Sequence, residues 1–174
     1  KANKNRDYRI FEEFAYYVIA DARKCRATDI FKLNGHVYAF DSTTIELCLN
    51  AFKWAVYRKN QGKGGIKVHT LYDIETSIPT FFHITEARVN DMNAMDAIPY
   101  EENKRKFIFF TNAFAEDERL DISPMMVAEL YRNRWQIELF FKWMKQHLKI
   151  KKFWGETENA VRIQIYSAQS RPIV

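Results

Sequence analysis

Apolar side chains recur at helical spacing in several parts of the chain. Residues 11–26 carry them at intervals of three and four, which is typical of an amphipathic helix. Ser123 followed by Pro124 is a helix start signal, with Ser at the N-cap and Pro at the first helical position. That helix is predicted to run without a break to about residue 148, and residues 159–167 are predicted to form a last one.

Short apolar runs bounded by turn residues predict strands. The segment 37–40 predicts a buried strand that ends at Asp41, where Asp-Ser-Thr-Thr has good turn chemistry. Two β-rich runs separated by a short polar connection predict an antiparallel hairpin. The ranges of these and the remaining predicted segments are hairpin strands 66–72 and 80–85, strand 107–110, helix or irregular segment 45–57 and loop 58–65. Loosely alternating helices and strands favour an α/β or α+β domain.

The composition excludes several classes of protein. With 47% hydrophobic and 28% charged residues the chain can bury a core, which excludes intrinsic disorder. The longest apolar run, residues 14–20, is too short to cross a bilayer, and no secretory signal pattern opens the sequence. The two cysteines lack metal-site spacing. We therefore expect an intracellular protein with no membrane partner.

The positive charge is concentrated in one short segment. The formal net charge is only +5, yet residues 131–152 hold seven basic side chains and one acidic side chain, a net charge of +6. Clustered Lys and Arg are typical of nucleic-acid binding, because they neutralise phosphates. A solvated helix face is the alternative that charge alone leaves open.

Four residues of this segment fall on one side of the predicted helix. At 3.6 residues per turn Tyr131, Arg134, Glu138 and Lys145 lie within an arc of roughly 60°. Glu138 sits at the border of the apolar stripe, between cations. Geometry alone also allows an ordinary surface pair of Arg134 and Glu138, worth only tenths of a kcal/mol.

The residue identities point further. The Y-(2)-R-(3)-E-(6)-K spacing of these four residues, the surrounding residues 130–146 and the later segment 153–160 resemble the YREK signature of bacterial insertion-sequence transposases of the insertion-sequence-four family, within the DDE superfamily. The resemblance implies a ribonuclease H-like α/β fold, a mixed sheet flanked by helices. It also implies that Glu138 is the last of three metal-binding acids and that Tyr131, Arg134 and Lys145 contact DNA phosphates.

The resemblance extends to the first half of the chain. Residues 39–43 resemble the family's first-aspartate strand, which makes Asp41 and Glu138 the candidate catalytic residues and metal ligands. Without the family, Asp41 would be taken as a turn-capping residue. Lys67 and His69 share one strand face by their period of two, so Lys67, together with Lys142, is a candidate DNA-binding residue. A structural role is an equal alternative for His69.

One part of the family pattern is missing. The family implies a second aspartate in an Asp-Arg-Gly-Tyr-like motif and then a large β-rich insertion, but residues 96–100 resemble the segment before that motif and 107–112 the segment after the insertion. We therefore expect an N-terminal helical region at 1–33 and a catalytic domain at 34–174, shortened between about 100 and 107. Asp91 and Asp96 are the acids that would be left to substitute.

These observations lead to one hypothesis with two alternatives. The resemblance implies a DNA transposase that uses Mg²⁺, in a two-metal site where Mn²⁺ can substitute, to cleave transposon ends and transfer strands into target DNA. It implies double-stranded DNA as partner, homodimers as an assembly and the bacterial cytoplasm, at the nucleoid, as location. Because the central aspartate is missing, this shortened chain is expected to be inactive. The alternatives are a non-catalytic DNA-binding remnant and a degenerate reading frame without a stable fold.

Overall fold

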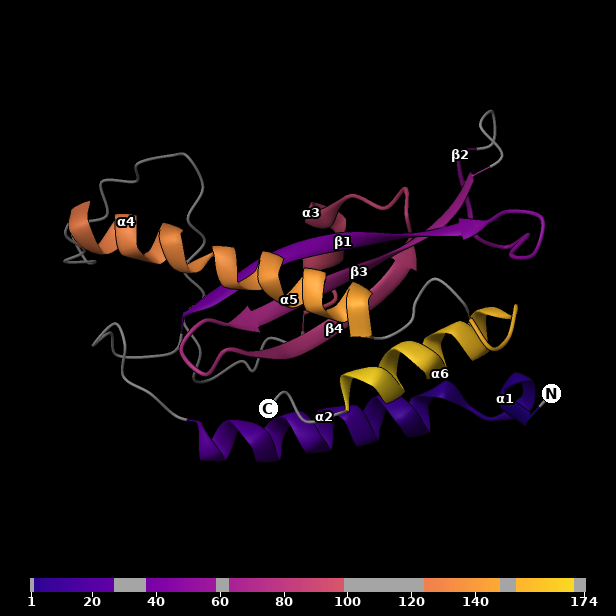
Figure 1. The fold of residues 1–174 in the computed structure, drawn as a ribbon, viewed down its shortest axis with the longest axis horizontal. Helices are drawn as coiled ribbons and strands as arrows, with labels where there is room; N and C mark the ends of the chain where they lie inside the picture. Colours follow the sequence, from indigo (N-terminus) through magenta and orange to yellow (C-terminus); the bar gives the residue numbers. More distant parts are fainter. Residues whose placement is uncertain (1, 27–36, 59–62, 99–123, 148–152, 171–174) are drawn as a thin grey trace.

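A four-stranded antiparallel sheet with helices around it forms the centre of the molecule (Figure 1). The computed structural model describes residues 2–26, 37–58, 63–98, 124–147 and 153–170. The elements in chain order are α1 (Ala2–Asn5), α2 (Tyr8–Cys25), β1 (Tyr38–Cys48), β2 (Val56–Arg58), β3 (Lys63–Asp73), β4 (Ile78–Glu86), α3 (Asp91–Met95), α4 (Pro124–Asn133), α5 (Trp135–His147) and α6 (Glu158–Gln169).

Strand β3 is the central strand of the sheet. It pairs antiparallel with β1 on one side and with β4 on the other, and β2 pairs with its beginning. The β3–β4 pair confirms the predicted hairpin. Its turn is held by the buried carboxylate of Asp73, which accepts hydrogen bonds from the backbone N–H groups of Glu75 and Thr76 (3.0 and 3.3 Å) and from Arg23 (2.7 Å). The hairpin is thereby tied to α2.

Strand β1 is much longer than the sequence pattern predicted. The expected turn after residue 40 is wrong: residues 41–44 continue the strand in register with residues 70–67 of β3. The expected helix or irregular segment at 45–57 is also wrong in its first part, since β1 runs to Cys48. The β-branched run Thr43-Thr44-Ile45 favours a strand, and pairing with β3 outweighs the local turn chemistry of Asp-Ser-Thr.

The glycines that suggested a loop before residue 66 belong to the sheet. Residues 63–65 begin β3, so the predicted loop is wrong there, while 59–62 lie outside the described residues. A Cβ on Gly64 would lie 2.8 Å from the carbonyl oxygen of Ala55 and 3.1 Å from that of Leu47. Only glycine permits this close approach of backbones, so Gly64 serves strand packing rather than loop flexibility.

Helices α2 and α6 lie side by side next to β4 (Figure 1). Asp7 caps α2 by accepting from Arg9 N–H, and Thr157 caps α6 by accepting from Ala160 N–H. Tyr16 of α2 donates a hydrogen bond to the carbonyl of Phe82 at 3.0 Å, which fixes the helix against the sheet. The predicted helices at 11–26 and 159–167 are confirmed with slightly different ends.

The basic helix is broken where one continuous helix was predicted. The break lies at Arg134, between α4 and α5. The N–H of Arg134 is shared between the carbonyls of Leu130 and Tyr131 (3.1 and 3.2 Å), and the Asn133 side chain donates to the carbonyl of Glu129 at 2.8 Å. An Asn that bonds to nearby backbone competes with regular helix geometry, which accounts for the interruption.

Helix α5 covers one face of the sheet. Its buried residues are Ile137, Phe140, Phe141 and Met144. The ring of Phe140 lies 5.6 Å from that of Tyr72 on β3 and 6.1 Å from that of Phe82 on β4, measured between centroids. These aromatic contacts join the C-terminal half of the chain to the sheet.

Candidate active site

Strand pairing places Asp41 on the face of the sheet that α5 covers. Asp41 lies opposite Thr70 of β3, which in turn lies opposite Phe82 of β4, and directly opposed residues share a face. Phe82 contacts Phe140 of α5, so Asp41 belongs to the same side. Asp41 is the fourth of the 11 residues of β1. The predicted position of Asp41 at the carboxyl end of its strand is therefore wrong.

One arginine joins the two predicted acids. Arg134 donates from Nη1 to Asp41 Oδ2 at 3.3 Å and from Nη2 to Glu138 Oε1 at 2.9 Å. The exposed fractions of the three side chains are 44% for Arg134, 30% for Asp41 and 38% for Glu138. The structure thus brings together two acids that lie nearly a hundred positions apart, at a site that solvent reaches.

The charges around Asp41 act on its pKa in opposite directions. Burial raises the pKa, and the carboxylates of Asp91 and Glu138 add to this effect. The N–H of Ser42, which donates to Asp41 Oδ1 at 2.8 Å, and the Arg134 guanidinium lower it. The net result is a raised pKa, so Asp41 holds its negative charge less readily than a free aspartate and benefits from a nearby cation.

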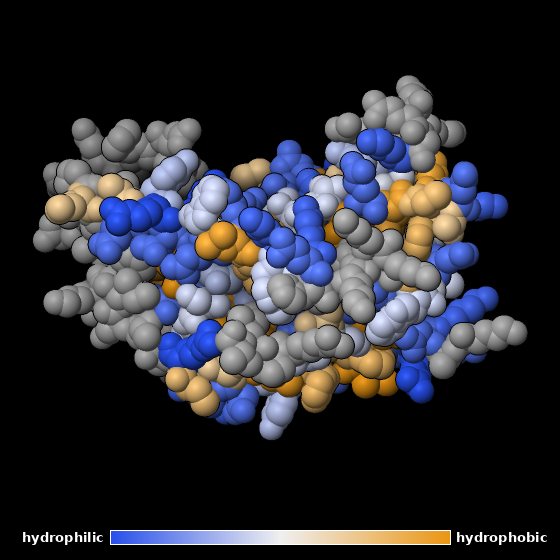
Figure 2. All heavy atoms as spheres, in the orientation of Figure 1, coloured by the Kyte–Doolittle hydropathy of each residue, from blue (hydrophilic) through white to orange (hydrophobic). Residues whose placement is uncertain are grey.

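The other predicted DNA-binding residues of the basic segment lie on the outer side of α4 and α5. Tyr131 is 70% exposed, and its ring lies 5.8 Å from the guanidinium carbon of Arg134. Lys142 and Lys145 are exposed on α5, while Lys149, Lys151 and Lys152 lie outside the described residues. Figure 2 shows hydrophilic side chains with scattered apolar ones over this side of the molecule. The solvated residues form an accessible cationic surface next to the two acids.

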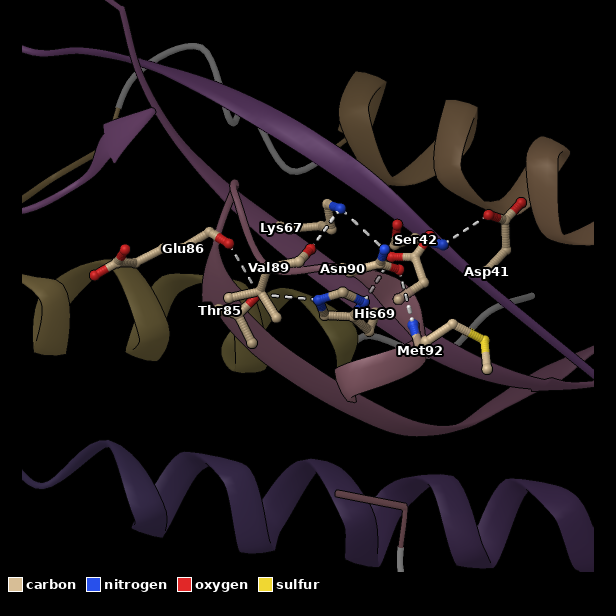
Figure 3. Close-up of polar contacts among 10 residues, drawn as sticks. Asp41, Ser42, Lys67, His69, Thr85, Glu86, Val89, Asn90 and Met92 are labelled. Carbon is tan, nitrogen blue, oxygen red and sulfur yellow. Dashed lines mark hydrogen bonds and ion pairs between the residues drawn. The ribbon is translucent and has the colours of Figure 1, made fainter. Parts of the chain in front are cut away.

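Lys67 and His69 belong to the opposite face of the sheet. His69 lies opposite Ser42, and its Nε2 is 2.9 Å from Thr85 Oγ1 while its Nδ1 is 3.0 Å from Asp91 Oδ1. The Lys67 ammonium donates to the carbonyl of Val89 at 2.7 Å and lies 3.5 Å from Asp91 Oδ1, with 17% of its side chain exposed. In Figure 3 the Asp41 carboxylate points away from this group.

Burial sets the charge state of His69. Burial lowers the pKa of the ring to about 4, although Asp91 acts in the opposite direction, so the ring is neutral at pH 7. The contacts support the structural alternative for His69. The same contacts show that the Asp91 carboxylate binds Lys67 and His69 on the face of the sheet away from Glu138.

The comparisons with known proteins identify the family. The model described as "Transposase DDE domain" matches the chain in two segments, residues 34–121 and 115–169. The chain belongs to the transposase DDE domain family. Its antiparallel sheet flanked by helices is a mixed α/β architecture consistent with the ribonuclease H-like core of such transposases. No solved structure matches it.

Three curated relatives of this DDE domain are named as transposases. A "Putative transposase y4zB" of Sinorhizobium fredii is 60% identical over 42 residues, 24% of the chain and 12% of the relative. A "Putative transposase for insertion sequence element IS4SA" of Synechocystis is 32% identical over 106 residues, 60% of the chain and 29% of the relative. A "Probable transposase for insertion sequence element IS5377" of Geobacillus stearothermophilus is 34% identical over 70 residues, 37% of the chain and 19% of the relative.

These relatives place the DDE domain among insertion-sequence transposases. The chain spans less than a third of the length of each relative that it matches. Within its described part, no helix is both long and apolar enough to cross a membrane.

The two acids of this DDE domain fit one hard divalent cation. Asp41 Oδ2 and Glu138 Oε1 both point at the same cationic group, the guanidinium of Arg134. Mg²⁺ prefers oxygen ligands and is often held by one or two carboxylates together with water and substrate phosphates. Across the described ranges no group of three or more His, Cys, Asp or Glu side chains could hold a metal ion. The acids seen here therefore suit one ion better than two.

Sequence reasoning missed the contact that organises this site. The i, i+4 spacing had paired Arg134 with Glu138, but no local signal links Arg134 to Asp41, which is 93 positions away. One local signal was available for Asp41. The β-branched run Thr43-Thr44-Ile45 indicates that β1 continues past Asp41, and the alternation of a strand then indicates the face on which its carboxylate lies.

Proposed function

We propose that this domain is the metal- and DNA-binding part of a transposase whose intact form acts in DNA transposition through metal-dependent phosphoryl transfer. Asp41 and Glu138 are the metal-holding acids of this reaction. Tyr131, Arg134, Lys142 and Lys145 hold the phosphates of a double-stranded transposon end. The observation that carries the proposal is that Arg134 contacts both acids, so the two predicted ligands converge on one cationic position beside an exposed basic surface.

The residues of the site have separable tasks. A divalent ion held by Asp41 and Glu138 would act as a Lewis acid that polarises a phosphate oxygen. Burial and the neighbouring acids raise the pKa of Asp41, so a cation is electrostatically favoured there. The exposed Lys and Arg side chains bind and orient phosphates, because guanidinium and ammonium groups form charge-assisted hydrogen bonds with them.

Lys67 fits this function less directly. Its ammonium group is engaged by the carbonyl of Val89 and lies near Asp91, on the face away from Glu138. Because Lys67 is mostly buried, it would contribute its positive charge to DNA binding without a direct phosphate contact. The exposed cations of α5 are the stronger candidates.

A calorimetric titration with Mn²⁺ tests the metal-holding acids. We expect one ion to bind the wild-type chain and binding to be lost in Asp41→Asn and in Glu138→Gln. Asp91→Asn is the matched control, because it removes a carboxylate whose charge reaches Asp41 but whose oxygen faces His69 and Lys67. It should still bind the ion.

The same titration separates the alternatives. A chain that binds duplex DNA but no Mn²⁺ supports a non-catalytic DNA-binding remnant, which the exposed basic surface of α4 and α5 would also serve. Loss of Mn²⁺ binding in Asp91→Asn alone would move the metal position to the other face of the sheet and contradict the proposed ligands.

A further inference from the structure

Three of the four carboxylate oxygens at the site already have partners. Asp41 Oδ1 accepts from Ser42 N–H at 2.8 Å. Asp41 Oδ2 and Glu138 Oε1 accept from the two terminal nitrogens of Arg134. An ion that used both acids would therefore compete with Arg134 for Asp41 Oδ2 and Glu138 Oε1.

Resting on the proposed function, we propose that Arg134 is a displaceable cation that keeps the position between Asp41 and Glu138 closed to metal until its guanidinium moves to a DNA phosphate. In the closed arrangement the guanidinium occupies one oxygen of each acid and offsets one of their two negative charges. Once it leaves, both carboxylates lose their shared cation, and the site gains affinity for a divalent ion.

The surroundings of Arg134 allow this movement. Its side chain is 44% exposed, so a phosphate in solvent can reach the guanidinium. The Tyr131 ring, 70% exposed and 5.8 Å from the guanidinium carbon, offers a cation–π surface along the way out. A guanidinium binds phosphate through two parallel N–H groups, the same pair that Arg134 now uses on two separate carboxylates.

The proposal implies that metal and DNA help each other to bind. A phosphodiester that holds Arg134 removes the competitor of the metal, and a metal that holds the acids releases Arg134 for the phosphodiester. Because binding coupling is reciprocal, each ligand should tighten the other by the same factor.

The first test measures Mn²⁺ affinity by calorimetry in the absence of DNA. Arg134→Gln should bind Mn²⁺ roughly 5- to 150-fold more tightly than wild type, the usual range of coupling between two ligands. Arg134→Lys keeps the charge but cannot bridge both acids, so it should fall in between. The matched control is Arg132→Gln, which removes the same charge from an exposed position two residues away and should change affinity about twofold at most, because solvent screens it.

The second test measures the affinity of a short fluorescein-labelled duplex by anisotropy, with and without Mn²⁺ at constant ionic strength. Mn²⁺ should tighten duplex binding to the wild type and to Arg132→Gln, and leave Arg134→Gln unaffected. Equal Mn²⁺ affinities in wild type and Arg134→Gln, or an equal gain in Arg132→Gln, would overturn the displacement while leaving the metal site in place. Absence of Mn²⁺ binding in every variant, Arg134→Gln included, would instead overturn the metal site of the proposed function.

Discussion

At the scale of single residues, His69 shows how burial converts an ionisable side chain into a source of pH sensitivity. Its ring is completely buried between Thr85 and Asp91, and burial lowers its pKa to about 4 from an ordinary 6.5. The unfolded chain takes up a proton at this residue as the pH falls below about 6.5, whereas the folded chain resists protonation until about pH 4. Between these values the unfolded state binds more protons, so acid destabilises the fold.

We therefore predict that the free energy of unfolding of the wild type falls as the pH is lowered from 7 to 5. The free energy of unfolding of His69→Gln should fall less over the same interval. Urea unfolding at both pH values measures this difference. His83, whose pKa burial also lowers, keeps part of the pH dependence in the variant. Identical losses in wild type and His69→Gln would contradict the assignment of the effect to His69.

The sequence predicted which residues form the candidate site better than it predicted how those residues contact one another. The identities and spacing of Tyr131, Arg134, Glu138 and Lys145 resemble the family's signature, and this resemblance indicated the family. The contact between Arg134 and Asp41 was not predictable, because it depends on how β1 and α5 meet in space. Long-range polar contacts of this kind leave no trace in local sequence periodicity.

At the scale of elements, the β3–β4 hairpin depends on one buried ion pair. Asp73 is fully buried and binds Arg23 of α2 at 2.7 Å, besides two N–H groups of its own turn. Asp73→Ala would leave the largely buried Arg23 guanidinium without this partner. We predict a loss of about 3–5 kcal/mol in the free energy of unfolding, the usual result of breaking a buried pair from one side.

Urea denaturation of this variant has a control within the same sheet. Glu46→Ala removes an exposed carboxylate that lies 3.7 Å from Lys63 and should cost less than about 1 kcal/mol, as surface pairs do. Comparable losses in the two variants would show that the hairpin is held by its strand pairing and not by Asp73.

The basic segment carries the second prediction at this scale. Duplex DNA should bind with little sequence selectivity and with an affinity that falls steeply with salt, because the binding releases counterions. The double variant Arg134→Ala/Lys145→Ala should weaken binding to all sequences alike and flatten the slope of log K against log salt by about two, one for each lost phosphate contact. Anisotropy titrations over a series of salt concentrations give that slope. Unchanged affinity at low salt would show that the exposed cations of α4 and α5 only solvate the helix surface.

Element type was predictable where periodicity was long and uninterrupted. The helix at 11–26 was found because it buries one regular face. The helix at 159–167 and the hairpin were found from their apolar runs, although α6 and β3 are buried on nearly all sides. The length of β1 and the break at Arg134 were not found, since both depend on interactions that override local preference: pairing with β3 in the first case, and the Asn133 side chain bond to Glu129 in the second.

At the scale of the whole molecule, β1 has an unusual position in the sheet. Among the described strands it pairs with β3 alone, and none of them occupies its other edge. No Asp-Arg-Gly-Tyr motif occurs in the sequence, and the family resemblance predicts that the strand carrying it lies beside the first-aspartate strand. A long edge strand presents unpaired N–H and C=O groups that attract other chains.

We predict that the purified protein associates as its concentration rises and unfolds with low cooperativity. Sedimentation velocity over a concentration series detects the first property, and urea unfolding followed by fluorescence and circular dichroism detects the second. A monodisperse monomer with coincident, sharp transitions would show that this edge of β1 does not attract other chains.

The last prediction concerns the metal-dependent DNA cleavage that the family resemblance implies. Two-metal phosphoryl transfer needs acids that hold two ions about 3.5–4 Å apart, and misplacement by about 1 Å can cost a hundredfold in rate. Asp41 and Glu138 offer oxygens for one ion, and Asp91 is turned to Lys67 and His69 on the other face of the sheet. We therefore expect no Mg²⁺-dependent cleavage of supercoiled plasmid DNA by the chain as it stands, and any weak Mn²⁺-dependent nicking should disappear in Asp41→Ala.

Inserting a family-like segment with its Asp-Arg-Gly-Tyr strand between Tyr100 and Phe107 should restore cleavage, and Glu138→Ala should abolish it again. Robust Mg²⁺-dependent cleavage without the insertion would mean that another acid completes the site, and Asp91→Asn and Asp96→Asn would then identify it.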